Sequence, residues 1–255
     1  MNLGKEILFF FGALGAFNGF ILSAYFLFFR KKYLANLFLG ALLLALSIRI
    51  TVTVFVYFNN ALPKTYLQIG LSSCLFIGPF LYCFLKAGIH SINMIPQKWK
   101  YHLAIWLIVI FGIGILFPYQ NYPVLWNDYF VALIFLQWLS YLFVSGFESR
   151  MLLQKMIQNY KNATPAEKWF GMIFFGNAII FLFYFLGFAR VPFISCVTGC
   201  VSFTFIMYLA FLILLHRKKT DDLFLLNMQK GKKLNPKEAS ILAEKLEKII
   251  WRHDI

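Results

Sequence analysis

Long apolar runs separated by short polar loops are the dominant pattern of this sequence. Seven of these runs approach the ~20 residues that a helix needs to cross the hydrocarbon core of a bilayer. They are residues 7–29, 34–58, 66–88, 103–117, 129–147, 169–188 and 192–215. The pattern predicts an all-α membrane protein with seven transmembrane helices, of which the fourth is the shortest.

The pattern changes after residue 215, where polar and basic residues replace the apolar run. The sequences HRKK at 216–219 and KGKK at 230–233 are basic clusters, and such clusters beside a membrane attract anionic lipid head groups. An Asn-Pro pair at 235–236 then gives a helix-start signal. The following apolar residues recur at helical spacing and predict an amphipathic helix. Its apolar face carries Leu242, Leu246, Ile249 and Ile250.

Three regions follow from these patterns. Residues 1–215 are predicted to be the transmembrane module, 216–235 a basic juxtamembrane linker, and 236–255 the amphipathic helix. The apolar face of that helix needs a partner, and a second copy of the chain is one candidate, which would make a homodimer. We read 7–29 as a retained helix and not a signal peptide, because it has no basic start or small-residue cleavage site.

Composition supports a lipid environment for most of the chain. Hydrophobic residues make up 61% and charged residues 13%, against about 25% charged residues in a typical soluble domain. The predicted loops place 13 Lys and Arg residues on one side and 3 on the other. Because cytoplasmic loops are enriched in Lys and Arg, the N-terminus is predicted outside and the C-terminus in the cytoplasm. The net charge of +14 therefore does not require a nucleic acid.

Two local patterns predict details of the helices. Thr164, Pro165 and Glu167 have the spacing of a capping box with proline at the first helical position, so a helix is expected to begin there. Small residues spaced three and four apart in the first run predict a face on which another helix packs closely. These residues are Gly12, Gly15 and Gly19.

Few polar side chains lie inside the predicted spans, so each is a candidate for function. A cation at membrane depth costs roughly 2.5–3.5 kcal/mol on insertion scales and persists only with a partner or a polar cavity around it. Arg49 is such a cation, and we predict that Asp128, at the outer end of the fifth span, is its partner. The polar residues that could join them in one network are Asn18, Gln137 and Asn177. Arg49 is either a sensing residue or half of a structural ion pair, and the amides either join it or bridge helices.

Catalysis and metal binding have little support in the sequence. The predicted spans contain no Asp or Glu, and every His lies in a loop or at an end. Cys196 and Cys200 are four residues apart but lack the further ligands that a metal site needs. We therefore expect no enzyme activity, no cofactor and no metal.

Three stretches resemble a known family. They are ANLFLGALLLALSIRI at 35–50, YLQIGLSSCLFIGPFLYCF at 66–84 and EASILAEKLEKII at 238–250. They resemble the membrane-anchored AraC-type transcriptional regulators of bacteria. The resemblance implies a seven-helix membrane module, a basic linker and a helix that leads into two helix-turn-helix motifs, with a multi-pass location in the bacterial inner membrane. The sequence given stops where that DNA-binding part would begin, so DNA binding is expected only through a domain that is absent here.

The leading hypothesis is a sensory, signal-transducing module of a one-component transcriptional regulator. An unidentified small ligand or a membrane state would shift the helices, and the shift would reach residues 236–255 through the last span. A small seven-helix transporter and the membrane half of a sensor kinase are the alternatives. The lack of intramembrane acids and of interrupted helix pairs weighs against the transporter.

Overall fold

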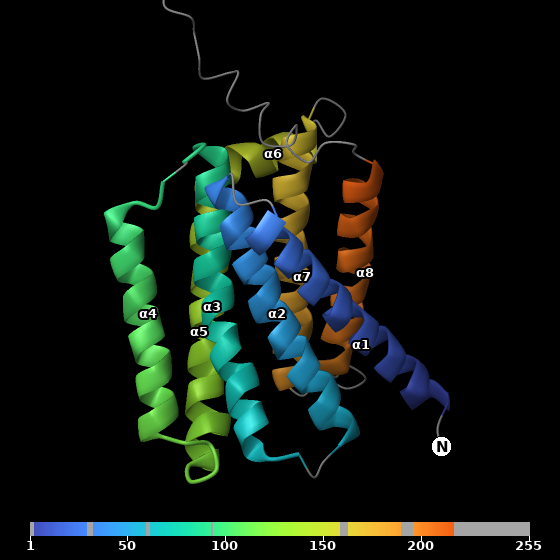
Figure 1. The fold of residues 1–255 in the computed structure, drawn as a ribbon, viewed down its shortest axis with the longest axis vertical. Helices are drawn as coiled ribbons and strands as arrows, with labels where there is room; N and C mark the ends of the chain where they lie inside the picture. The colour runs from blue at the N-terminus through green and yellow to red at the C-terminus, as the bar shows by residue number, and fades with distance from the viewer. Residues whose placement is uncertain are drawn as a thin grey trace, which may run out of the picture.

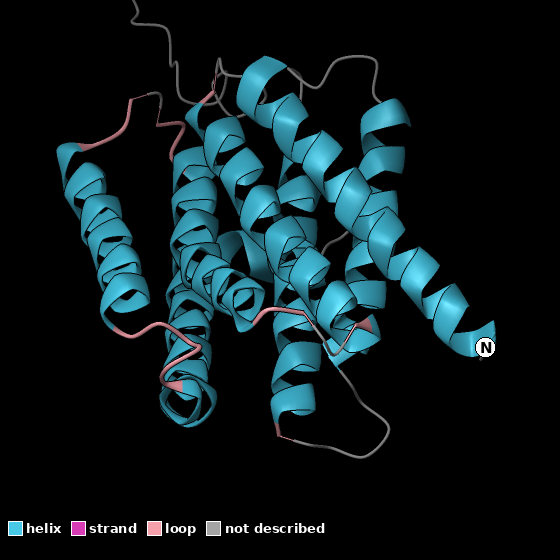
Figure 2. Ribbon diagram, turned by 60° about the horizontal axis from the view of Figure 1, so that its bottom comes forward, coloured by secondary structure: helices cyan, strands magenta, loops and turns pink. Residues whose placement is uncertain are grey.

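The computed structural model describes residues 3–29, 33–59, 62–92, 94–158, 163–189 and 196–216, which form helices joined by short connections. The elements are α1 (Leu3–Ala24), its π-helical continuation η1 (Tyr25–Phe29), α2 (Leu34–Phe58), α3 (Lys64–Ile89), α4 (Gln97–Leu116), the π-helical η2 (Leu125–Phe130), α5 (Val131–Glu148), α6 (Arg150–Gln158), α7 (Pro165–Phe188) and α8 (Cys196–His216). The long helices run side by side, and α6 lies across one end of the bundle (Figure 1). The described part of the chain contains no strand, and α1 crosses its neighbours obliquely (Figure 2).

Six helices of the described residues are long and apolar enough to cross a membrane. They are Phe9–Phe29, Leu34–Phe58, Lys64–Ile89, Gln97–Leu116, Leu125–Glu148 and Ala166–Phe188. They match the first six predicted spans, although the fourth begins six residues earlier than its apolar run. The seventh run forms α8, whose described apolar stretch is Gly199–Ala210. A membrane crossing by α8 stays a prediction. The linker and the amphipathic helix at 236–255, with Leu242, Leu246, Ile249 and Ile250, lie outside the described residues.

Helix α2 is the centre of the bundle. It packs along α3 on one side and α1 on the other, and it also contacts α8. Leu39 and Ile50 of α2 are completely buried. In lipid, helices associate through close packing and not through a hydrophobic driving force. The packing of α2 against three helices therefore fixes their relative positions.

The glycines of α1 form the predicted close-packing face. A Cβ atom at Gly12 would lie 2.7 Å from Cγ2 of Val54 on α2, and one at Gly15 would collide with Thr204 of α8. The backbone of α1 approaches α8 so closely that the Thr204 hydroxyl donates a hydrogen bond to the Phe11 carbonyl, at 2.7 Å. The prediction of a glycine face is confirmed, and its partners are α2 and α8.

The predicted helix start at Thr164 is also confirmed. The Glu167 N–H donates to the Thr164 hydroxyl at 3.3 Å, and the Thr164 N–H donates to the Glu167 carboxylate at 2.7 Å. Pro165 is the first residue of α7. Lys155 of α6 donates to both Glu167 oxygens at 2.7 Å, which joins α6 to the start of α7.

Helix α6 is absent from the sequence prediction, which treated 148–168 as a polar loop. Its half-buried side chains include Leu152, Leu153 and Met156, which are spaced three and four apart as on one face of a helix. Charged and amide residues between them hid this short amphipathic pattern. The Met156 side chain packs against Gly171 of α7, so α6 packs on the first two turns of α7.

Replacing Gly15 by alanine should destabilise the bundle, because the added methyl group would displace Thr204. Overpacking of this kind costs about 1–3 kcal/mol. Gly112 is the matched control, because a Cβ atom there would meet nothing within 4 Å. Gly112→Ala should be neutral or stabilising by up to ~1 kcal/mol, since alanine has the higher helix propensity. Thermal unfolding of both variants in the same detergent measures the difference. Equal destabilisation of the two would contradict the close contact between α1 and α8.

Candidate functional site

The guanidinium group of Arg49 lies over an aromatic ring inside the bundle. Its Cζ atom is 5.0 Å from the centroid of the Tyr184 ring, which belongs to α7. Arg49 itself is half-buried on α2, and Tyr184 is only 1% exposed. A cation over the face of an aromatic ring is stabilised by about 0.5–1 kcal/mol at an exposed site and by more when it is desolvated. The ring thus offsets part of the cost of a charge at this depth.

The hydroxyl group of Tyr184 joins three helices. It lies 3.2 Å from the Thr53 hydroxyl of α2 and 3.5 Å from the Cys200 sulfur of α8. The Thr53 hydroxyl also lies 2.9 Å from the Arg49 carbonyl, to which it donates. Buried tyrosine hydroxyls need hydrogen-bonding partners, and here they come from α2 and α8. Tyr184 therefore ties the arginine-bearing helix to α8.

A second buried hydrogen bond lies next to this one. The Trp138 ring of α5 has its centroid 6.5 Å from that of Tyr184. Its indole N–H donates to Oδ1 of Asn177 on α7, at 2.9 Å. Trp138 and Asn177 are 1% and 3% exposed. Arg49, Tyr184, Trp138 and Asn177 thus form one cluster, which we call the Tyr184 cluster and which includes Thr53 and Cys200.

Gln137 bridges two helices, which is one of the two roles predicted for it. Its side-chain N–H donates to the Leu75 carbonyl of α3, at 3.1 Å. Leu75 is four residues before Pro79, which lies inside α3. Because proline has no N–H, it cannot close the usual helical bond to that carbonyl. In lipid an unpaired carbonyl costs several kcal/mol, so Gln137 stabilises α3 at its proline and bridges α3 to α5.

The remaining predicted residues lie apart from the Tyr184 cluster or at its edge. Asp128 is exposed in η2, which continues directly into α5, and α5 packs mainly on α3. An ion pair between Asp128 and Arg49 stays a prediction, and the aromatic neighbour of Arg49 is Tyr184. Asn18 is half-buried on α1, one residue before Gly19, whose Cα faces Ser47 and Phe203. Of the five predicted residues, the structure brings Arg49 and Asn177 into one cluster.

The sequence reasoning missed Tyr184 and Trp138, which hold the cluster together. Both were counted as apolar residues of their spans. The signal available for Trp138 was its position, since tryptophan in membrane proteins favours the two interfaces and Trp138 lies in the middle of α5. Tyr184 lies four residues before the end of α7, where an interface tyrosine is ordinary, so its position gave no such signal. An aromatic residue with a polar group at mid-span calls for a buried partner.

The chemistry available to the Tyr184 cluster is hydrogen bonding and charge stabilisation. Throughout the described ranges, no group of three His, Cys, Asp or Glu side chains comes close enough together to hold a metal ion. The cluster combines a guanidinium, two hydroxyls, a thiol, an indole and an amide from α2, α5, α7 and α8. A change in any one bond alters how these four helices are held.

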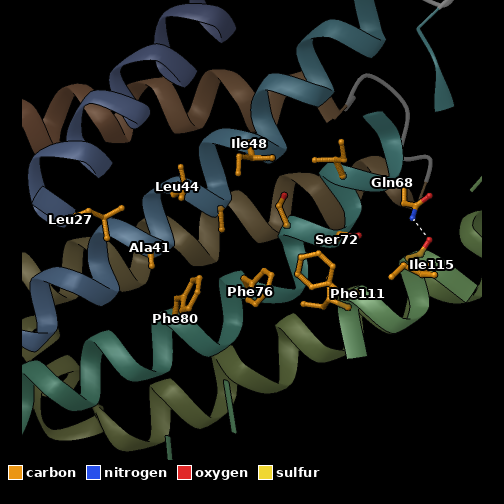
Figure 3. A pocket seen from close by; sticks show the side chains of 15 residues that line it. Leu27, Ala41, Leu44, Ile48, Gln68, Ser72, Phe76, Phe80, Phe111 and Ile115 are labelled. Carbon is orange, nitrogen blue, oxygen red and sulfur yellow. Dashed lines mark hydrogen bonds between the residues drawn. The ribbon is translucent and has the colours of Figure 1, made fainter. Parts of the chain in front are cut away.

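A large apolar cavity lies on the other side of α2. It has a volume of about 690 Å³ and is bounded by α2, α3, α4 and Leu27 of η1 (Figure 3). Ile48 of α2 points into it, and the next residue, Arg49, belongs to the Tyr184 cluster. Helix α2 therefore separates a polar cluster from an apolar cavity.

Comparisons with protein-family models, curated proteins and solved structures found no match to this chain.

Removing Gln137 should destabilise the protein only when Pro79 is present. Gln137→Leu leaves the Leu75 carbonyl without a donor, and an unsatisfied buried group costs about 1–3 kcal/mol. In a Pro79→Ala background the alanine N–H can donate to the Leu75 carbonyl, so Gln137→Leu should cost much less there. A double-mutant cycle in chemical denaturant measures the coupling between the two sites. A coupling near zero would show that Gln137 does not compensate for Pro79.

Proposed function

We propose that this chain is a membrane sensory module, with seven transmembrane helices and with the Tyr184 cluster as its responsive element. The observation that carries the proposal is the contact of the cluster with α8. Tyr184 reaches Cys200 of α8 at one side and Arg49 and Thr53 of α2 at the other. Cys200 lies near the start of α8, and the other end of this helix precedes 217–255, so a change at Arg49 would travel along α8 to reach that segment.

A buried hydroxyl with two neighbours suits a switching role. Because the Thr53 hydroxyl donates to the Arg49 carbonyl, it can only accept from Tyr184, whose hydroxyl can donate either to Thr53 or to the Cys200 sulfur. Signalling needs an element with two arrangements that differ by a few kcal/mol, and a single hydrogen bond is worth about 0.5–1.5 kcal/mol. Exchange between the two partners would change how α7 holds α2 and α8.

The proposed orientation places the N-terminus outside and the end of α8 in the cytoplasm. Its support is the distribution of charge over the two ends of the bundle. The end that carries α6, visible at the top of Figure 1, also holds Lys86, Lys98 and Lys100. Cytoplasmic loops carry an excess of basic residues, and this face would contact anionic lipids.

The proposed class is a bacterial one-component transcriptional regulator of the AraC type, located in the inner membrane. Its support is the resemblance of 35–50, 66–84 and 238–250 to that family. DNA would be bound through a domain outside this sequence, and the segment 236–255 would couple α8 to it, as a dimer. A transporter is the alternative, and liposome flux that disappears in Arg49→Gln would favour it.

The test compares Arg49→Gln with the wild-type chain in lipid nanodiscs by hydrogen–deuterium exchange. Coupling free energies between sites are typically 1–3 kcal/mol, or about 5–150-fold. The proposal therefore predicts that exchange in the cytoplasmic half of α8 and the residues after it becomes at least about fivefold faster. Arg150→Gln is the control, because Arg150 also lies over an aromatic ring, that of Phe147, but is exposed at α6.

The pattern of exchange distinguishes the outcomes. Faster exchange in α8 in the Arg49 variant, with no change there in the Arg150 variant, supports a signal path through the Tyr184 cluster. A change confined to peptides around residues 45–55 and 180–190 would contradict it, because Arg49 would then act only locally.

A further inference from the structure

Helix α4 stands at the edge of the bundle, held by side chains that bridge a gap. It packs along α3 and makes few close contacts with the other described helices, and it lies at the left edge of Figure 1. At its C-terminal end, Gln68 of α3 donates to the Gly114 carbonyl and accepts from the Tyr119 N–H, both at 2.8 Å. These bonds satisfy backbone groups that a helix end leaves without partners.

The other half of α4 is held to α5 by a hydroxyl group. The Trp106 indole N–H donates to the Tyr141 hydroxyl at 2.9 Å, and Nε2 of His102 lies 2.6 Å from the same oxygen. Tyr141 itself packs against Gly78 of α3, where a Cβ atom would approach within 2.8 Å. Polar bridges therefore hold both halves of α4, one to α3 and the other to α5.

The space between α2 and α4 is the cavity of about 690 Å³. It extends from Leu27, Ala41 and Phe80 at one end to Gln68 and Ile115 at the other (Figure 3). Its lining is also part of the outer surface, since Phe111 is 60% exposed and Ile115 is 76% exposed. The cavity thus opens sideways, towards the hydrocarbon of the bilayer.

The lining offers little to a polar ligand. Both polar atoms of Gln68 are already bonded, and the Ser73 hydroxyl donates to the Gly70 carbonyl at 2.8 Å. Ser72 is the other hydroxyl, and the remaining lining residues are apolar or glycine. Apolar cavities stay dry and take up apolar molecules, and the volume lies within the ~300–1,000 Å³ of ligand pockets. The occupant should therefore be a hydrocarbon.

The length of the cavity indicates which hydrocarbon. On α3 the lining runs from Gln68 to Phe80, which at ~1.5 Å per residue is about 18 Å along the helix. One leaflet of the hydrocarbon core is about half of ~30 Å. Lys64 is exposed one turn before Gln68, so a cation lies near the outer end, where a phosphate would be expected. We propose that the cavity binds one acyl chain of a bilayer phospholipid, which enters sideways between α2 and α4.

This inference requires only that the chain lies in a bilayer, and it does not depend on the sensory role. The test uses nanodiscs that contain a phosphatidylcholine with a diazirine in the middle of one acyl chain. After photolysis, mass spectrometry maps the labelled peptides. The cavity residues of α3 and α4, such as Phe76 and Phe111, should be labelled several-fold more than the exposed α5 residues Leu133 and Leu136, which serve as the internal reference.

Two substitutions fill the cavity from different walls, Ala41→Phe on α2 and Ser72→Phe on α3. Both positions line the cavity and are half-buried, so at least one variant should fold as the wild type does by thermal unfolding. Each should reduce cavity labelling to the level of the α5 reference. Ala104→Phe is the matched control, because Ala104 is exposed on α4 and outside the lining, and it should leave cavity labelling unchanged.

Three results would overturn the proposal. Cavity labelling no higher than the α5 reference would show that no acyl chain is held there. Labelling that persists in a folded, cavity-filled variant would place the lipid elsewhere. The third result comes from a parallel sample that contains a diazirine fatty acid in unlabelled phosphatidylcholine. Cavity labelling in that sample, without cavity labelling by the diazirine phosphatidylcholine, would identify a free fatty acid as the occupant.

Discussion

The contact between the Arg49 guanidinium and the Tyr184 ring is the constraint on which the interior of this bundle depends. A cation inside an apolar span must be held by its surroundings, and here the ring centroid lies 5.0 Å away. The ring can take that position only if its hydroxyl is also satisfied, and Thr53 and Cys200 lie at 3.2 and 3.5 Å from it. One half-buried charge thereby orders α2, α7 and α8, and Trp138 extends the arrangement to α5 and Asn177.

The two sides of α2 differ in how tightly they pack. On one side, glycines bring α1 against α2 and α8 so closely that a Cβ atom at Gly12 would lie 2.7 Å from Val54. On the other, polar bridges from Gln68 and Tyr141 hold α4 away and leave the apolar cavity. Because α2 carries Ile48 in the cavity and Arg49 in the Tyr184 cluster, occupancy of the cavity and the state of the cluster act on the same helix. If both proposals hold, a shift of α2 on lipid binding would be the physical link between them.

The features of this fold that could be predicted from the sequence are those set by local or periodic patterns. Apolar runs located the first six spans, and the capping pattern at Thr164 located the start of α7. What the sequence hides depends on which helices are neighbours. Tyr184 and Trp138 read as apolar residues until their partners on other helices are known, and Gln137 gains its meaning only from the carbonyl that Pro79 frees on α3. Asp128 was chosen because it lies at the depth of Arg49, but depth alone does not say which helices are neighbours, and the helix that η2 begins packs mainly on α3.

The central claim is tested most directly by the coupling free energy between Arg49 and Tyr184, measured with a double-mutant cycle in a bilayer. The single changes are Arg49→Gln and Tyr184→Leu. Cation–π pairs contribute about 0.5–1 kcal/mol when exposed and about 2 kcal/mol or more when desolvated, and residues in contact couple by ~0.5–3 kcal/mol. The account predicts a coupling in that range, and a smaller one between Arg49 and Asp128→Asn. A coupling near zero for Tyr184 together with a large one for Asp128 would show that the charge is held by an ion pair, and the Tyr184 cluster would lose its central role.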